Sequence, residues 1–82
     1  MAETWQNAKV EVSSDGRIRY EGVVIAYLPH VKIVVRDLNG EYVGCYRDVM
    51  QVVRELRVKE SAVLNVLRGR QRYHAGYSFW YV

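Results

Sequence analysis

Two short apolar stripes of helical period, separated by a few residues, constrain the fold of this 82-residue chain most strongly. Within residues 49–56, three valines and a leucine recur at i, i+3, i+4 and i+7, which places them on one face of a helix. Two valines and a leucine repeat this pattern within residues 63–67. The apolar positions are Val49, Val52, Val53, Leu56, Val63, Val66 and Leu67.

The residues around these stripes indicate where each helix begins and ends. Asp48 precedes the first stripe and is suited to accept hydrogen bonds from the first free backbone N–H groups. A break at residues 57–59 separates the stripes, and Gly69 follows the second stripe where a left-handed residue is expected. We therefore predict helices over 48–56 and 60–68. Two helices joined by a tight turn make a helix-turn-helix, whose second helix commonly enters the DNA major groove.

Alternating segments before and after the helices predict strands near 9–13, 17–27, 31–36, 41–45 and 77–82, the second with a break at Gly22 as an alternative. In the last strand Phe79 and Trp80 lie on opposite faces. The face with Phe79 is expected to cover the helices, and the face with Trp80 either completes the core or stays exposed. The predicted fold class is α+β. We expect one small domain over residues 1–82, with β-hairpins followed by a helix-turn-helix and a C-terminal strand.

Residues 31–82 resemble the nuclease-associated modular DNA-binding domain of phage and intron-encoded HNH homing endonucleases. The resemblance rests on the hairpin of residues 32–43 and on two motifs, Val66-Leu67-Arg68-Gly69 and Gly76-Tyr77-Ser78-Phe79-Trp80-Tyr81. Two positions depart from the pattern. Arg57 stands where the family usually has Gly in the turn, and Lys59 stands where a Ser or Thr N-cap is usual. The resemblance implies a DNA-binding module of phage or other mobile-element origin.

Residues 1–30 form an N-terminal hairpin region with a second resemblance. The segment from Trp5 to Arg19 is similar to a module that opens the same endonucleases, in which a Trp is followed by Val-Ser-x-x-Gly-Arg-Val-Arg. The spacing from Trp5 to Val12 is shorter than in that pattern. The alternative interpretation is an ordinary hairpin, because Ser-Ser-Asp-Gly at residues 13–16 is a common turn between alternating strands.

The sequence predicts that the chain is not an enzyme. In the homing endonucleases an HNH segment supplies the His and Asn residues that metal-assisted phosphodiester cleavage needs. Here His30 and His74 fall in different predicted elements, without a carboxylate or Cys at ligand spacing. Cys45 is expected to be a small apolar residue of a strand and not a nucleophile or ligand. Asp37 and Glu41 flank the predicted hairpin turn and are not expected to form an acid/base pair. We expect no cofactor and no metal site.

Composition and segment lengths point to a cytoplasmic location, and the resemblance to phage modules implies that the cell is a bacterial host. One cysteine allows no intrachain disulfide, which is consistent with a reducing compartment. The first residues lack the pattern of a secretory signal, and no apolar run approaches the length of a membrane span.

Basic side chains gather in the second half of the chain. Residues 1–45 carry five basic and six acidic side chains, net −1, whereas residues 46–82 carry seven and three, net +4. Such clustering is the electrostatic footprint of phosphate contact, although solvated basic surfaces are also common. We expect helix 60–68 to be the recognition helix, with exposed positions at 60–62, 64, 65 and 68. The predicted DNA-binding residues are Lys59, Ser61, Asn65, Arg68, Arg70, Arg72 and His74.

Two other functions remain open from the sequence alone. The module is able to serve as a protein-binding inhibitor or adaptor that acts on host nucleic-acid or defence machinery, with Leu64 and Trp80 as interface residues. RNA binding is the least favoured, because no common RNA-binding signature is present. One module alone binds DNA weakly, so tight binding requires a homodimer or a tethering partner.

Overall fold

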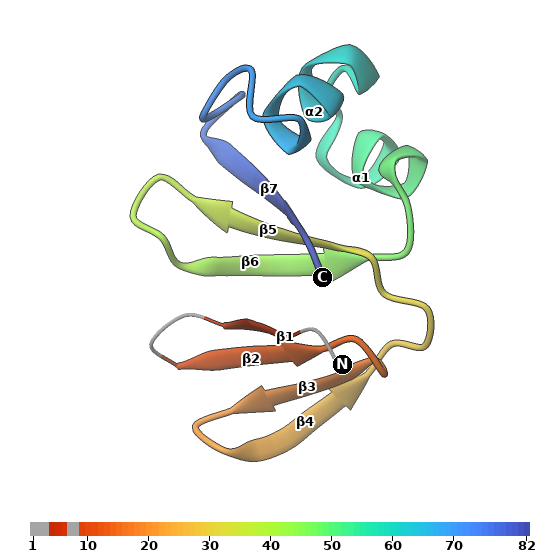
Figure 1. Cartoon of the computed structure of the whole chain (residues 1–82), viewed down its shortest axis with the longest axis vertical. Coiled ribbons are helices and arrows are strands. Elements are labelled where there is room, and N and C mark those ends of the chain that lie inside the picture. The colour runs from red at the N-terminus through yellow and green to blue at the C-terminus, as the bar shows by residue number, and fades with distance from the viewer. Residues whose placement is uncertain (1–3, 7–8) are drawn as a thin grey trace.

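Two antiparallel sheets and a pair of helices make up the computed structural model, which describes residues 4–6 and 9–82 (Figure 1). The order of the N-terminal sheet is β1-β2-β3-β4, and that of the C-terminal sheet is β6-β5-β7. The N-terminal sheet consists of β1 (Thr4–Gln6), β2 (Val10–Ser13), β3 (Arg17–Tyr20) and β4 (Val23–Tyr27). The remaining elements are β5 (Ile33–Asp37), β6 (Tyr42–Tyr46), α1 (Val49–Leu56), α2 (Glu60–Leu67) and β7 (Tyr77–Tyr81). The predicted α+β class is confirmed.

Two tight turns shape the N-terminal sheet. Gly16 has φ +99° at the β2–β3 turn, and a Cβ there would collide with the backbone of Leu28, so this position requires glycine. Glu21 and Gly22 both have positive φ and connect β3 to β4 as a two-residue hairpin turn. The segment 17–27 is therefore two strands with a break at Gly22, which was the alternative to one continuous strand. Strand β1, which pairs with β2, has only three residues and was not predicted.

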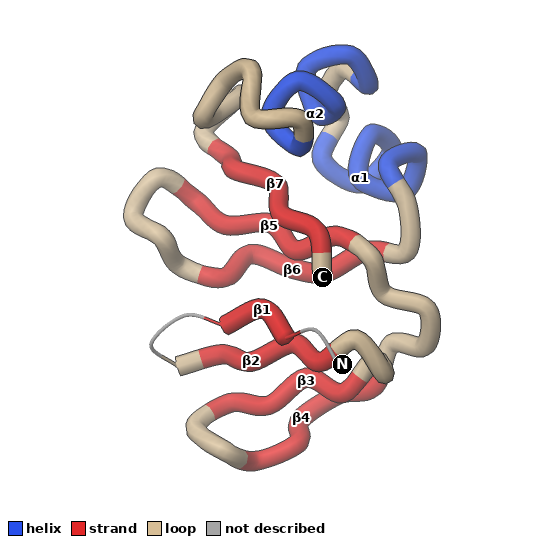
Figure 2. Tube along the Cα trace, in the orientation of Figure 1, coloured by secondary structure: helices blue, strands red, loops and turns tan. Residues whose placement is uncertain are grey.

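The C-terminal sheet places the end of the chain beside its middle. β7 pairs antiparallel with β5, with Val35 opposite Phe79 and Val34 opposite Trp80. β5 is thus the central strand and is covered on both faces, because Ile33, Val34 and Val35 are all fully buried. Figure 2 shows β7 running from the helices back across this sheet.

Two clusters of buried side chains lie on opposite faces of β5. One cluster packs β5 and Phe79 against the helices, chiefly through the fully buried Val52 and Val63. The other joins Val34 to the inner face of the N-terminal sheet, including the fully buried Val12. The apolar stripes predicted for the helices therefore do cover one face of the C-terminal sheet.

The helix ends differ in how well they are capped. Asp48 caps α1, since its Oδ1 accepts a hydrogen bond from the Gln51 backbone N–H at 2.8 Å. Lys59 precedes α2 without a side-chain cap, and Arg57 adopts the left-handed conformation, with φ 55° and ψ 48°. Among the described residues, no helix is long and apolar enough to cross a membrane.

Candidate nucleic-acid interface

The C-terminal end of α2 fixes the position of an arginine-rich segment, residues 68–72. The carbonyl oxygen of Asn65 accepts hydrogen bonds from the backbone N–H groups of Arg70 and Gln71, at 2.9 and 3.4 Å. Gly69 has φ +80° and donates to the Val66 carbonyl at 3.1 Å, so it makes the predicted left-handed stop. These bonds satisfy carbonyl groups at the helix end and fold the arginine-rich segment back against α2.

A second set of bonds anchors the chain between the arginine-rich segment and β7. The backbone groups of His74 and Tyr77 exchange two hydrogen bonds of 2.9 Å around a turn in which Ala75 and Gly76 have positive φ. The Gln71 side-chain amide donates to the Tyr73 carbonyl at 2.8 Å. The arginine-rich segment is therefore held at both ends, and the side chains of Arg68, Arg70 and Arg72 are all exposed.

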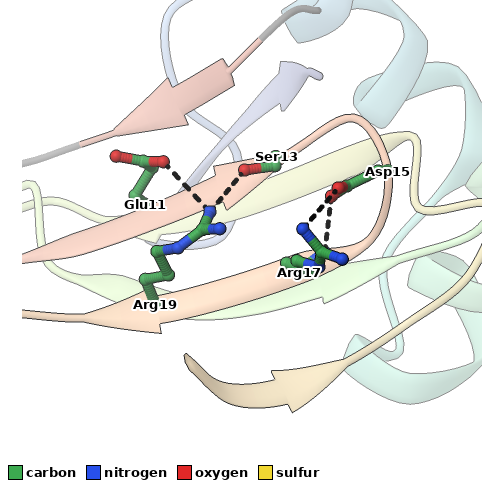
Figure 3. A network of polar contacts seen from close by, with 5 residues as sticks. All are labelled: Glu11, Ser13, Asp15, Arg17 and Arg19. Carbon is green, nitrogen blue, oxygen red and sulfur yellow. Dashed lines mark hydrogen bonds and ion pairs between the residues drawn. The ribbon is translucent and has the colours of Figure 1, made fainter. Parts of the chain in front are cut away.

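The arginines of this segment differ in their surroundings from those of the N-terminal sheet. In that sheet Arg19 contacts the Glu11 carboxylate at 3.4 Å and the Ser13 hydroxyl at 3.0 Å, and Arg17 lies 3.6 Å from the Asp15 carboxylate (Figure 3). Residues 61–82 contain no Asp or Glu, and within the described part of the chain no ion pair is formed by the arginines of 68–72. Within residues 61–82 the positive charge is therefore not offset by any acidic side chain.

The structure places most, but not all, of the predicted DNA-binding side chains on the surface. Lys59 and Ser61 are exposed at the start of α2, and His74 is half-buried. The prediction that 62, 64 and 65 are exposed was wrong, because Ala62, Leu64 and Asn65 are half-buried. The reason is that α2 packs against both α1 and β7, so its solvent-exposed face is narrower than one apolar stripe suggests.

Trp80 lies at the surface beside this segment and does not complete the core. It is 44 % exposed, the Arg36 guanidinium lies 5.5 Å from its ring centroid, and its Nε1–H donates to the Ser78 hydroxyl at 2.9 Å. Trp80, Tyr73 and Arg72 line a hollow of about 420 Å³ between β7 and the end of α2. Val82, from the same face of the strand, packs in the cluster between the sheets instead. A role for Leu64 and Trp80 in binding a protein stays a prediction.

The other residues that could take part in catalysis or metal binding lie apart from one another, in a turn, in a connection and on a strand. The Asp37 carboxylate accepts hydrogen bonds from the backbone N–H groups of Asn39 and Glu41, at 2.8 and 3.0 Å, and so stabilises the β5–β6 turn. His30 is exposed in the connection between β4 and β5. Cys45 is half-buried on β6, and burial raises the pKa of its thiol.

One exposed feature was missed in the sequence. All five residues of β4 are exposed, although four of them are large apolar side chains: Val23, Val24, Ile25 and Tyr27. The available signal was the uncharged run of residues 23–28, but an apolar strand pattern does not reveal whether its strand lies at a sheet edge.

The fold and the arginine-rich end define a small α+β module in which two short helices pack on a three-stranded sheet. The family model described as "DNA endonuclease I-HmuI-like, NUMOD-like domain" matches residues 33–80, well over half of the chain, and the chain belongs to this family of homing-endonuclease-associated DNA-binding modules. Comparison with curated proteins and with solved structures gives no match. The matched residues include α1, α2 and most of β7, whereas the resemblance of the N-terminal region stays a prediction.

Proposed function

We propose that this chain is a non-catalytic DNA-binding protein of phage or mobile-element origin, which contacts duplex DNA through α2 and the arginine-rich segment. The observation that carries the proposal is the coincidence of two facts. The chain belongs to a DNA-binding module family, and the segment that follows its second helix presents three exposed arginines with no acidic residue after position 60.

The arginine-rich segment is suited to phosphate contact. Arg70 and Arg72 lie beyond the end of α2, where the backbone N–H groups of Arg70 and Gln71 bond to the Asn65 carbonyl, so the arginine side chains extend from an anchored main chain. Arginine binds phosphate oxygens through charge-assisted hydrogen bonds, and such contacts position a protein on DNA without reading its sequence. Arg68, at the end of the helix, adds a third cation.

The residues at the N-terminal end of α2 are the ones proposed to contact the DNA bases. In a helix-turn-helix the N-terminal residues of the second helix reach the base edges, and here Lys59 and Ser61 are exposed at that end. Asn65 has side-chain groups that match an adenine edge, but it is half-buried, so its contribution is confined to the part of the helix face that remains open.

The proposal assigns no catalytic residues. Hydrolysis of a phosphodiester needs groups that activate water and stabilise the leaving oxygen. His30 lies in the connection between β4 and β5, and His74 lies in the turn before β7, so the two histidines belong to different connecting segments. We expect purified protein with Mg²⁺ or Mn²⁺ to leave supercoiled plasmid DNA intact. Nicking that is lost on His74→Ala or His30→Ala would contradict this part of the proposal.

Salt-dependent binding tests the DNA proposal. Fluorescence anisotropy with a random-sequence duplex is measured from about 50 to about 200 mM salt for the wild type and for Arg70→Ala/Arg72→Ala. Each lost phosphate contact should flatten the slope of log K against log salt by roughly 0.9, so the double variant should lose roughly 1.8. Arg17→Ala/Lys32→Ala removes the same charge from exposed positions in other parts of the molecule, and it should leave the slope unchanged. The absence of binding at the lowest salt concentration, or equal losses in both double variants, would overturn the proposal.

A further inference from the structure

Strand β4 is an exposed sheet edge with an apolar sequence. It is the last strand in the order β1-β2-β3-β4, and its side chains at Val23, Val24, Ile25 and Tyr27 are 65, 51, 60 and 65 % exposed. Soluble proteins usually protect such edges with charged residues, proline or a covering segment. Residues 23–28 contain no charged residue and no proline. In the β3–β4 pairing Ile18 lies opposite Ala26 and Arg19 lies opposite Val24, so Ile25 has no partner in β3 and β4 bulges there. This bulge is the one edge-protecting feature seen among the described residues of β4.

We propose that β4 is a self-association surface, at which a second copy of this chain adds its own β4 in antiparallel register. Pairing of two identical edges in this way is closed by a two-fold axis, so it forms a dimer rather than an open chain. Each β4 supplies backbone N–H and C=O groups along its free edge, which is the basis of strand addition.

The sequence of β4 is compatible with pairing to itself. With the two-fold axis at Ile25, the two bulged residues face each other and the regular pairs lie on either side of the bulge: Val24 faces Ala26, and Val23 faces Tyr27. β-branched and aromatic residues in such cross-strand positions are favourable. The nearest acidic side chain, Glu21, falls opposite Pro29 of the second copy, so no like charges oppose each other.

The size of the contact at β4 indicates how tightly the dimer should associate. A strand that adds at the edge covers only the flanks of the four large side chains of β4, because they project from the two faces of the sheet, so the contact is smaller than the roughly 800 Å² per partner of a standard interface. Backbone hydrogen bonds and the flanking residues, Tyr20 and Leu28, add to this contact. We therefore expect a weak dimer, with a dissociation constant on the order of micromolar or higher.

The position of β4 leaves the other functional surface free. β4 lies at the end of the molecule opposite α1 and α2 (Figure 1). A dimer formed through β4 therefore carries two outward-facing helix pairs, and the second DNA contact becomes intramolecular once the first has formed. The dimer itself is inferred from β4 alone and does not depend on DNA binding.

Sedimentation velocity over a range of protein concentrations tests the inference. The wild type should shift from monomer to dimer as concentration rises, and Ile25→Lys should weaken this association by roughly tenfold or more, because it places two like charges opposite each other. Val43→Lys is the matched control. Val43 is also an exposed valine on an edge strand, β6, so this variant should associate like the wild type. Circular dichroism verifies that both variants are folded.

A cross-link fixes the register. In a Cys45→Ala background, Ile25→Cys should form an intermolecular disulfide under oxidised glutathione, because paired residues lie within about 4.5–5.5 Å between Cα atoms. Val43→Cys in the same background should remain monomeric. A wild type that is monomeric at all concentrations overturns the inference, as does association that Val43→Lys disrupts and Ile25→Lys does not.

Discussion

Replacing Arg57 by glycine should stabilise the protein. Arg57 ends α1 in the left-handed conformation at φ 55° and ψ 48°, which glycine adopts without a steric penalty. A non-glycine residue pays roughly 1–2 kcal/mol in this conformation. Glycine loses more freedom on folding, which offsets roughly 0.5–1 kcal/mol of that gain. The expected net effect of Arg57→Gly is a stabilisation of up to about 1.5 kcal/mol, with a central value of roughly 0.75 kcal/mol.

The same chemical change three residues earlier provides the control. Arg54 is exposed in the last turn of α1, where glycine in place of arginine costs about 0.8–1 kcal/mol in helix propensity. For a chain of this length, 1 kcal/mol corresponds to a shift of roughly 4–8 °C in Tm. Thermal denaturation followed by circular dichroism should therefore show a rise of a few degrees for Arg57→Gly and a fall for Arg54→Gly. Equal falls in both variants would refute the reasoning about the turn.

Two further stability predictions follow from the caps and the buried titratable groups. Asp48→Ala should cost about 1 kcal/mol in urea denaturation, because it removes the acceptor for the Gln51 N–H, and an unchanged unfolding midpoint would show that this cap contributes nothing. The pKa of Tyr42 is raised well above its ordinary 10.0, mainly by burial and to a smaller extent by the hydrogen bond with Cys45. Burial also raises the pKa of Cys45 above 9.0 and that of Tyr46 above 10.0. The unfolded chain therefore loses these protons first, so stability is fully present below about pH 9 and falls as pH rises further. Urea midpoints at about pH 8 and about pH 10.5 measure this loss, which Tyr42→Phe should reduce, and a midpoint that does not fall would contradict it.

Local patterns in the sequence predicted the elements near the C-terminus well. Helix α1 and helix α2 were predicted to within one residue, because a 3.6-residue stripe and a cap are local signals that need no knowledge of the partner. For the same reason, Asp48 caps α1 and Gly69 ends α2 in the left-handed conformation, as predicted. The left-handed turn at Arg57 was not predicted, because its arginine gives no local sign of that conformation.

Features set by tertiary packing could not be predicted in this way. The placement of β7 beside β5 depends on contacts between distant parts of the chain, and no alternation within β7 specifies its neighbour. Leu64 and Asn65 were expected on an open helix face, but contact of α2 with both α1 and β7 half-buries them. The apolar sequence of β4 suggests burial, and only the strand order shows that it forms an exposed edge.

The most direct test of DNA binding is to map the contact surface residue by residue. Two-dimensional ¹H–¹⁵N NMR spectra of the labelled protein are recorded while a short duplex is added at low salt. If the protein binds DNA as proposed, backbone amide signals should shift in residues 59–74, at the start of α2 and along the arginine-rich segment, with β2 and β3 unchanged. Spectra that do not change, or changes confined to β2 and β3, would contradict the proposal.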